Sequence, residues 1–185
     1  MLLTQSYYEH GFWTKEQRDQ IFIDSVNSIN NTHYSLKIKI HPSSEILSDY
    51  QKLLNNIDVD VPIFQKGDLI DFLRETDLVI TWGIASSVIY PILMGIPVVL
   101  YNPLNPIALG AKDEIFVKNK FVIYCDNATE ITQSFEKAFL NPLSEKNLIK
   151  LIKTYLFNSD GKSAERISDY VLDFLSKRNG ERITF

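Results

Sequence analysis

Cysteine and histidine are scarce in this sequence. Its 185 residues include one cysteine, Cys125, so no disulfide can form within the chain and a cysteine-rich zinc site is excluded. The three histidines, His10, His33 and His41, are too scattered to match a metal-binding motif. We therefore expect no metal site.

The sequence also lacks a strong excess of charge and a long apolar run. Lys and Arg number 19 against 23 Asp and Glu, a net charge of −4, whereas a nucleic-acid-binding domain usually carries a basic face. The longest apolar stretch, residues 84–100, is interrupted by serine, proline and glycine and is too short for a membrane span of about 20 residues. The first residues do not resemble a signal peptide. These absences predict a cytoplasmic protein without a transmembrane segment, which binds no nucleic acid and would associate with a membrane only through a partner.

Short apolar runs alternate with longer amphipathic patterns over the first 124 residues. Strands are expected at Leu2–Ser6, Tyr34–His41, Val61–Phe64, Asp77–Thr81, Pro97–Tyr101 and Phe121–Tyr124. Helices are expected at Thr14–Asn31, from Ser43 or Ser44 to about Asn55, at Asp68–Thr76 and at Ser86–Met94. Short buried strands that alternate with helices are typical of a parallel sheet covered on both faces. We therefore predict a three-layer, doubly wound α/β fold with about six parallel strands.

The second half of the chain departs from this alternation. Residues Asn102–Lys120 form one long irregular stretch, and irregular loops of this length in compact domains are often functional. Only helical patterns follow residue 124, and the last of them is expected to turn its apolar face inward through Ile167, Tyr170, Val171, Phe174 and Leu175. We expect a single domain over residues 1–185, with an α/β core at about 1–141 and C-terminal helices at 144–178.

Polar residues follow several of the expected strands. Ligands of open parallel sheets bind beyond the carboxyl ends of the strands, and His10, His41 and the segment from Gly83 to the Ser86–Ser87 pair all fall at that edge. A glycine lets the backbone approach a ligand closely. The two serines begin a helix, where free amides and the helix dipole favour an anion. Ser86 could equally be a simple helix cap and His41 a turn residue, and these roles are compatible with phosphate binding.

Common nucleotide-binding and hydrolase motifs are missing. The chain has no G-x-x-x-x-G-K-[ST] loop, no G-x-G-x-x-G turn after the first strand and no G-x-S-x-G elbow. A P-loop nucleotidase and an NAD dehydrogenase are therefore disfavoured. Cys125 has no basic neighbour in the sequence and is predicted to be a buried small residue.

The order of three segments resembles a known family. Asp77–Ser87 (DLVITWGIASS) followed by Met94–Val99 (MGIPVV) resembles the signature of GT-B glycosyltransferases. Ile40–Pro42 (IHP) resembles the His-Pro motif of bacterial sialyl- and polysialyltransferases and capsule-synthesis proteins. Asp160–Ile167 (DGKSAERI) is similar to the tail of UDP-N-acetylglucosamine 2-epimerases and CDP-glycerol glycerophosphotransferases. The resemblance covers the whole chain, as the Rossmann-like, nucleotide-sugar-binding C-terminal half of a GT-B enzyme of surface polysaccharide synthesis.

The resemblance implies a donor site and a missing second half. Its phosphate-binding residues would be His41, Thr81, Gly83, Ser86 and Ser87, with further donor contacts from His10, Gly11, Phe64, Lys66 and Asn102. The segment Asn102–Asp113 would approach the sugar. No cofactor is implied, because the nucleotide sugar is itself the substrate. The acceptor domain would belong to a longer protein or to a separate partner subunit.

Two departures from the family limit what the resemblance implies. Many UDP-sugar enzymes carry a ribose-binding glutamate in the helix after the glycine turn, whereas Val88–Ile92 offers no acid, which favours a CMP- or CDP-linked donor. The paired catalytic residues of the epimerases are not visible either. The alternatives to a glycosyltransferase donor domain are a sugar-nucleotide epimerase, a non-catalytic donor-binding subunit that needs a partner, and a domain that binds another phosphate ligand.

Overall fold

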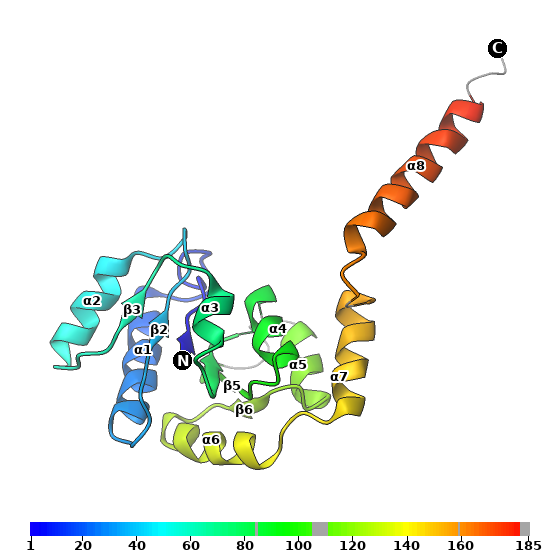
Figure 1. Ribbon diagram of the computed structural model, residues 1–185. Helices are drawn as coiled ribbons and strands as arrows, with labels where there is room; N and C mark the ends of the chain where they lie inside the picture. Colours follow the sequence, from blue (N-terminus) through cyan, green and yellow to red (C-terminus); the bar gives the residue numbers. More distant parts are fainter. Residues whose placement is uncertain (84, 105–110, 159, 182–185) are drawn as a thin grey trace. The chain divides into compact units, whose positions relative to one another are not determined.

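The computed structural model describes residues 1–83, 85–104, 111–158 and 160–181 (Figure 1). The chain forms two compact units, Met1–Asn147 and Leu148–Phe185. The second unit contains the end of α7 (Glu145–Leu151), a π-helical turn (Ile152–Leu156) and α8 (Ser163–Glu181).

The first unit is built on a parallel sheet of six strands. The strands are β1 (Leu2–Leu3), β2 (Ile38–Lys39), β3 (Ile63–Phe64), β4 (Val79–Thr81), β5 (Val98–Tyr101) and β6 (Ile123–Cys125). Their order is β3-β2-β1-β4-β5-β6, and every pair is parallel. The order reverses between β1 and β4, which is the switch point where open α/β sheets bind ligands. The predicted doubly wound fold of about six strands is confirmed.

Helices cover both faces of this sheet, which gives the predicted three layers. One layer contains α1 (Lys15–Asn30), α2 (Leu47–Asn56) and α6 (Ile131–Leu140), the last preceded by a 3-10 turn (Ala128–Glu130). The other contains α3 (Leu69–Leu73), α4 (Ser86–Leu93) and α5 (Ala111–Lys118). None of the helices in the described ranges combines the length and the apolar character that a membrane crossing needs.

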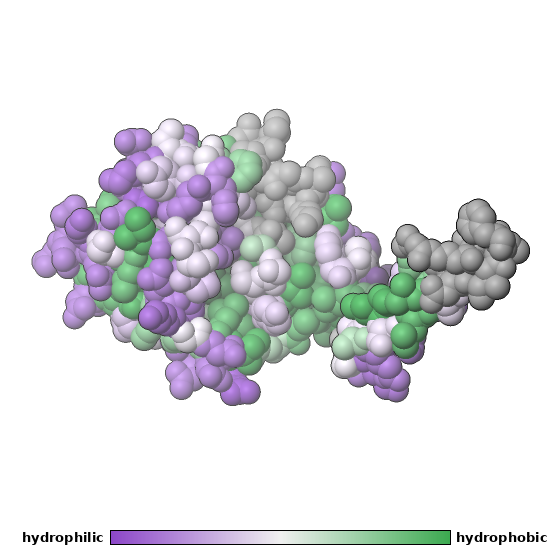
Figure 2. Space-filling model, turned by 90° about the horizontal axis from the view of Figure 1, so that it is seen from above, coloured by the Kyte–Doolittle hydropathy of each residue, from purple (hydrophilic) through white to green (hydrophobic). Residues whose placement is uncertain are grey.

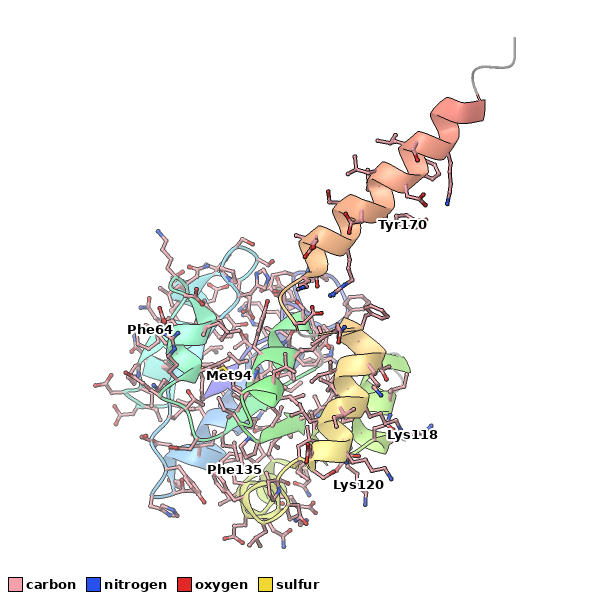
Figure 3. The ribbon with its side chains drawn as sticks, turned by 45° about the vertical axis from the view of Figure 1, so that its right-hand side comes forward. Phe64, Met94, Lys118, Lys120, Phe135 and Tyr170 are labelled. Atoms are coloured by element: carbon pink, nitrogen blue, oxygen red, sulfur yellow. The ribbon has the colours of Figure 1, made fainter. Side chains whose placement is uncertain are left out.

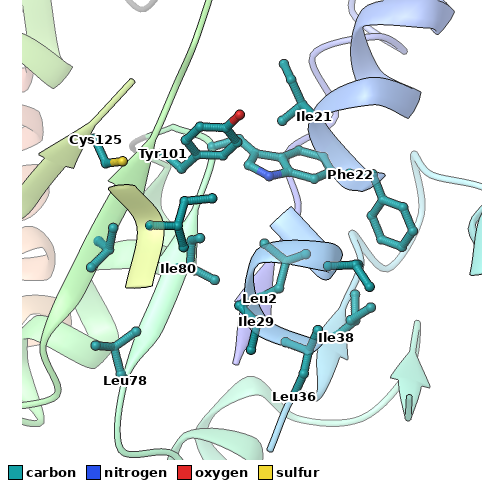
Figure 4. Packing of buried hydrophobic residues seen from close by; sticks show 14 of the residues in the cluster. Leu2, Ile21, Phe22, Ile29, Leu36, Ile38, Leu78, Ile80, Tyr101 and Cys125 are labelled. Atoms are coloured by element: carbon teal, nitrogen blue, oxygen red, sulfur yellow. The ribbon is translucent and has the colours of Figure 1, made fainter. Parts of the chain in front are cut away.

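The core between the sheet and the α1 layer is centred on Trp82, at the end of β4. Its indole is fully buried and donates to the Ser25 hydroxyl over 3.1 Å, while its ring contacts those of Trp13 and Phe22. Figure 4 shows aliphatic side chains of the strands, among them Leu2 and Ile80, in the same buried cluster as Phe22 of α1. Burial of these apolar side chains fixes α1 against the sheet and so sets where the loop after β1 can run.

Local signals in the sequence explain where some helices begin. Thr14 and Gln17 form the expected capping box at the start of α1, with bonds of 3.2 and 2.8 Å. The expected cap of α2 by Ser43 or Ser44 is wrong, because α2 begins at Leu47 after Ile46. The amides of both serines instead donate to the His41 side chain, which uses them in a turn.

One further expectation is corrected by the structure. The stretch Asn102–Lys120 is not irregular throughout, because its described part contains α5; residues 105–110 lie outside the described residues. Within the second unit, Ile167, Tyr170 and Phe174 on the apolar face of α8 are all more than half exposed. Figure 2 shows hydrophobic residues on this helix, and Figure 3 labels Tyr170. The expected inward turn of this face stays a prediction. Amphipathic spacing identifies an apolar face but not its partner.

The single cysteine provides a test of the core. Cys125 is 3% exposed, its thiol donates to the Asn127 carbonyl, and burial raises the pKa of this thiol. Because the thiolate is the reactive form, a thiol reagent should modify the native protein no faster than the protein unfolds. The rate of thiol modification can be measured by absorbance at increasing urea concentrations. This rate should rise over the same range of urea in which the circular dichroism signal of the folded protein is lost. Full modification of the folded protein within seconds at neutral pH would contradict this packing.

Candidate functional site

A cleft of about 370 Å³ opens at the carboxyl ends of the strands. Its walls come from the ends of β1 and β2, the loop after β3 and the turn between β4 and α4; the loops after β1 and β2 lie at the upper edge in Figure 1. The lining residues are Leu3, Thr4, Gln5, Lys39, Ile40, His41, Pro42, Gly67, Leu69, Ala85, Ser86 and Ser87. The cleft therefore lies at the sheet's switch point, between segments that are far apart in the sequence.

The carboxylate of Glu45 holds two of these walls together. It is 2% exposed and accepts bonds from the Thr4 hydroxyl after β1, from the His41 amide after β2 and from the Tyr50 hydroxyl on α2. Burial and then the Glu45 charge raise the pKa of Tyr50 far above its ordinary value, so Tyr50 stays a donor. A buried carboxylate with this many donors is satisfied, and it fixes the loops that carry the cleft.

Behind Glu45 lies a buried guanidinium that ties α1 to the loop after β1. Arg18 is 1% exposed and stacks between the rings of Tyr8 and Tyr50, 4.9 and 5.1 Å from their centres. It donates to Asp19 over 2.6 and 2.8 Å and pairs with Glu9 at 3.7 Å. Burial raises the pKa of Glu9. This cluster anchors the loop after β1 to the helix that follows it.

His41 has one ring nitrogen available for a ligand. Its Nδ1 accepts from the backbone amides of Ser43 and Ser44, at 3.3 and 3.1 Å. A nitrogen that accepts two amides carries no proton, so the hydrogen of the neutral ring is on Nε2. His41 therefore lines the cleft as a hydrogen-bond donor, and its turn role and its predicted ligand role coexist.

The start of α4 supplies the other predicted donors. Ala85 is the N-cap and makes no side-chain capping bond, so the alternative that Ser86 is a simple helix cap is wrong. Ser86 is exposed and Ser87 half-buried at the edge of the cleft. Their amides precede the first amide that bonds within the helix, that of Val88 to the Ala85 carbonyl. Two amides and two hydroxyls are therefore placed where an anion would bind.

Two predicted residues of this segment, Thr81 and Gly83, contact other parts of the protein and do not line the cleft. The Thr81 hydroxyl is fully buried, donates to the Gly83 carbonyl and accepts from Gln5, so it does not line the cleft. Gly83 makes room for the Tyr7 ring, because a Cβ there would lie 2.6 Å from Tyr7 Cζ. Ile84, within the resemblance to GT-B enzymes, lies outside the described residues.

The additional predicted contacts do not line the cleft. Asn102 is fully buried and bridges the Trp82 carbonyl and the Leu104 amide. Phe64 packs on Phe72, with ring centres 4.9 Å apart. His10, Gly11 and Lys66 are exposed, and none of them is a lining residue. Of the ten predicted positions, the structure brings His41, Ser86 and Ser87 together in the cleft.

Sequence reasoning missed Lys39. This lysine is the last residue of β2, is 7% exposed and lines the cleft. The signal was available, because a charged residue is unusual in a strand covered by helices on both faces. Thr4, Gln5 and Gly67 were also missed, and no local pattern marks them. Across the described ranges no group of three or more His, Cys, Asp or Glu residues could hold a metal ion, so the metal-free site stays a prediction.

The contact between Gly83 and Tyr7 can be tested by a double-mutant cycle. Gly83→Ala should lower the free energy of unfolding by about 1–3 kcal/mol, because the new methyl group must displace a ring packed on Trp13. In a Tyr7→Ala background the same change should cost much less, as measured by urea denaturation. Equal costs in both backgrounds would show that Tyr7 is not the reason for glycine at this position.

Comparison with known proteins gives no family for the chain. No model of a protein family matches it, and no curated protein matches it either. Inference about function therefore depends on the cleft and on the sequence segments that line it.

Proposed function

We propose that the chain is the donor-binding domain of a glycosyltransferase and binds the phosphate of a nucleotide sugar in this cleft. The main support for the proposal is that His41, Ser86 and Ser87 line the same cleft at the switch point of the sheet. These are the residues of the His-Pro and Ser-Ser segments, and His41 is 45 positions from Ser86 in the sequence. Two segments of one resemblance come together in one cleft, on the edge where phosphate ligands of such folds bind.

The donors in the cleft suit a leaving phosphate. In sugar transfer, the bond between the anomeric carbon and the phosphate oxygen breaks while an acceptor oxygen bonds to that carbon. Negative charge then grows on the phosphate, and preorganised donors that face such charge lower the barrier. The amides and hydroxyls of Ser86 and Ser87 and the Nε2–H of His41 are donors of this kind. The proposal needs no metal ion for this step.

The proposal assigns the acceptor and its base to another domain or subunit. Among the described lining residues none is a carboxylate, and the ring nitrogen of His41 that could accept a proton is occupied by two amides. The acceptor hydroxyl would therefore lose its proton to a group of the partner. Residues 1–185 alone are then expected to bind a nucleotide with little or no turnover.

The described residues give no support to the epimerase alternative. It rests on Asp160–Ile167, where the Asp160 carboxylate accepts from the Arg166 guanidinium over 2.9 Å and from the Lys162 amide over 3.1 Å. These bonds stabilise the start of α8. We therefore keep the donor-binding role as the function that the cleft supports best.

A thermal-shift panel of UDP, CDP, CMP and GDP tests the proposal with a matched variant. At 100 times its dissociation constant, a nucleotide should stabilise the protein by about 2.7 kcal/mol. His41→Asn keeps an acceptor for the amides of Ser43 and Ser44, as Asn does in Asx-turns, but removes the Nε2–H donor. The variant should melt like the wild type without ligand and show a smaller shift with the same nucleotide.

Two outcomes would count against the proposal. If none of the four nucleotides raises the melting temperature of the wild type, the cleft is not a nucleotide site. If His41→Asn binds as tightly as the wild type, the histidine has only the turn role that its Nδ1 bonds give it.

A further inference from the structure

Lys39 carries a buried positive charge at the floor of the cleft. Its side chain comes from the end of β2, and only 7% of the residue is exposed. The ammonium donates to two backbone carbonyls, that of Gln65 over 2.7 Å and that of Ile40 over 3.2 Å. Since an ammonium group has three donors, one remains for a further acceptor.

The charge of Lys39 lacks a direct counterion. Within the described part of the chain, no carboxylate comes within 4 Å of its Nζ. Glu45 contributes a weaker attraction, but its carboxylate oxygens are taken by Thr4, His41 and Tyr50. Burial lowers the pKa of the Lys39 ammonium, which reflects the cost of this charge in a desolvated place.

Lys37, two residues earlier on the same segment, has its charge paired with a carboxylate, as is usual for charged side chains. Its ammonium is 3.4 Å from the Glu75 carboxylate, is more exposed and does not line the cleft. The contrast is informative because buried charges are normally paired. Lys39 instead has two carbonyl acceptors and the Phe72 ring, whose centre is 6.0 Å from its Nζ, but no carboxylate. A ligand would bring the missing negative charge.

The rest of the lining supports this explanation. The other described polar side chains of the lining are neutral donors or acceptors: Thr4, Gln5, Ser86, Ser87 and His41 in the tautomer described above. None of the described lining residues is acidic. The described lining therefore has one positive charge and no carboxylate, while the Glu45 carboxylate lies behind it, bonded to Thr4 and the His41 amide.

We propose that Lys39 is the charged contact for the ligand's phosphate, so that the cleft selects nucleotides over uncharged nucleosides. The inference rests on the proposed function and deepens it. A phosphate oxygen would accept a hydrogen bond from the third N–H of the ammonium group, while the bonds to the carbonyls of Gln65 and Ile40 hold the side chain in position. A purely structural lysine would instead tie the end of β2 to the loop after β3 and contribute nothing to binding.

Isothermal titration with pyrophosphate, UDP, CMP and the nucleosides uridine and cytidine separates the two roles. Lys39→Met keeps the length of the side chain and removes the charge, and Lys37→Met is the matched control. Lys39→Met should weaken binding of pyrophosphate and of the nucleotide about 10- to 100-fold, the range expected for a charge-assisted hydrogen bond. Lys37→Met should bind like the wild type. The wild type should bind the nucleosides far more weakly than the nucleotides, a comparison that needs no variant to fold.

The outcomes distinguish this inference from the proposed function. If the wild type binds a nucleotide and Lys39→Met binds it equally well, or a nucleoside binds as tightly as its nucleotide, the role of Lys39 is overturned while the donor site stands. If pyrophosphate binds in a Lys39-dependent way and no nucleotide binds more tightly, Lys39 is an anion contact but the donor site is wrong. If the wild type binds none of these ligands, both proposals fail.

Discussion

The buried carboxylate of Glu45 is the contact on which the cleft depends. It joins the end of β1 through Thr4, the end of β2 through the His41 amide, and α2 through Tyr50. These three segments are otherwise separate in the chain, and short strands of two residues cannot fix their own loops. A carboxylate buried with a full set of donors is directional as well as strong, so it sets the position of His41 relative to the floor of the cleft.

The same carboxylate explains the electrostatics of the cleft. Because its oxygens bond to neutral donors, Glu45 lowers the cost of the nearby Lys39 charge without neutralising it by direct contact. Gln65 links the two residues, since its side chain donates to the Glu45 carbonyl and its own carbonyl accepts from Lys39. The result is a rigid floor with one positive charge, opposite the first amides of α4. Such a floor suits a phosphate group better than a neutral or cationic ligand.

The sequence predicted the fold well, because short buried strands and amphipathic helices leave periodic patterns that do not depend on tertiary contacts. It also predicted that His41, Ser86 and Ser87 follow strands of a parallel sheet, and these three residues line one cleft. The errors concern long-range partners. Thr81 bonds to Gln5, 76 residues away, and Gly83 makes room for Tyr7; no local pattern records such contacts. The spacing of the apolar residues in α8 likewise predicts an apolar face without showing what covers it.

The central claim is that a nucleotide phosphate binds between β2 and the start of α4. Titration of ¹⁵N-labelled protein with UDP or CMP, followed by amide NMR, tests it most directly. The account predicts that the largest shift changes occur at the amides of Ser86 and Ser87 and near His41, with a single dissociation constant for all three. Shifts confined to the opposite edge of the sheet, around Tyr34 and Phe139, or no shifts at all, would contradict it.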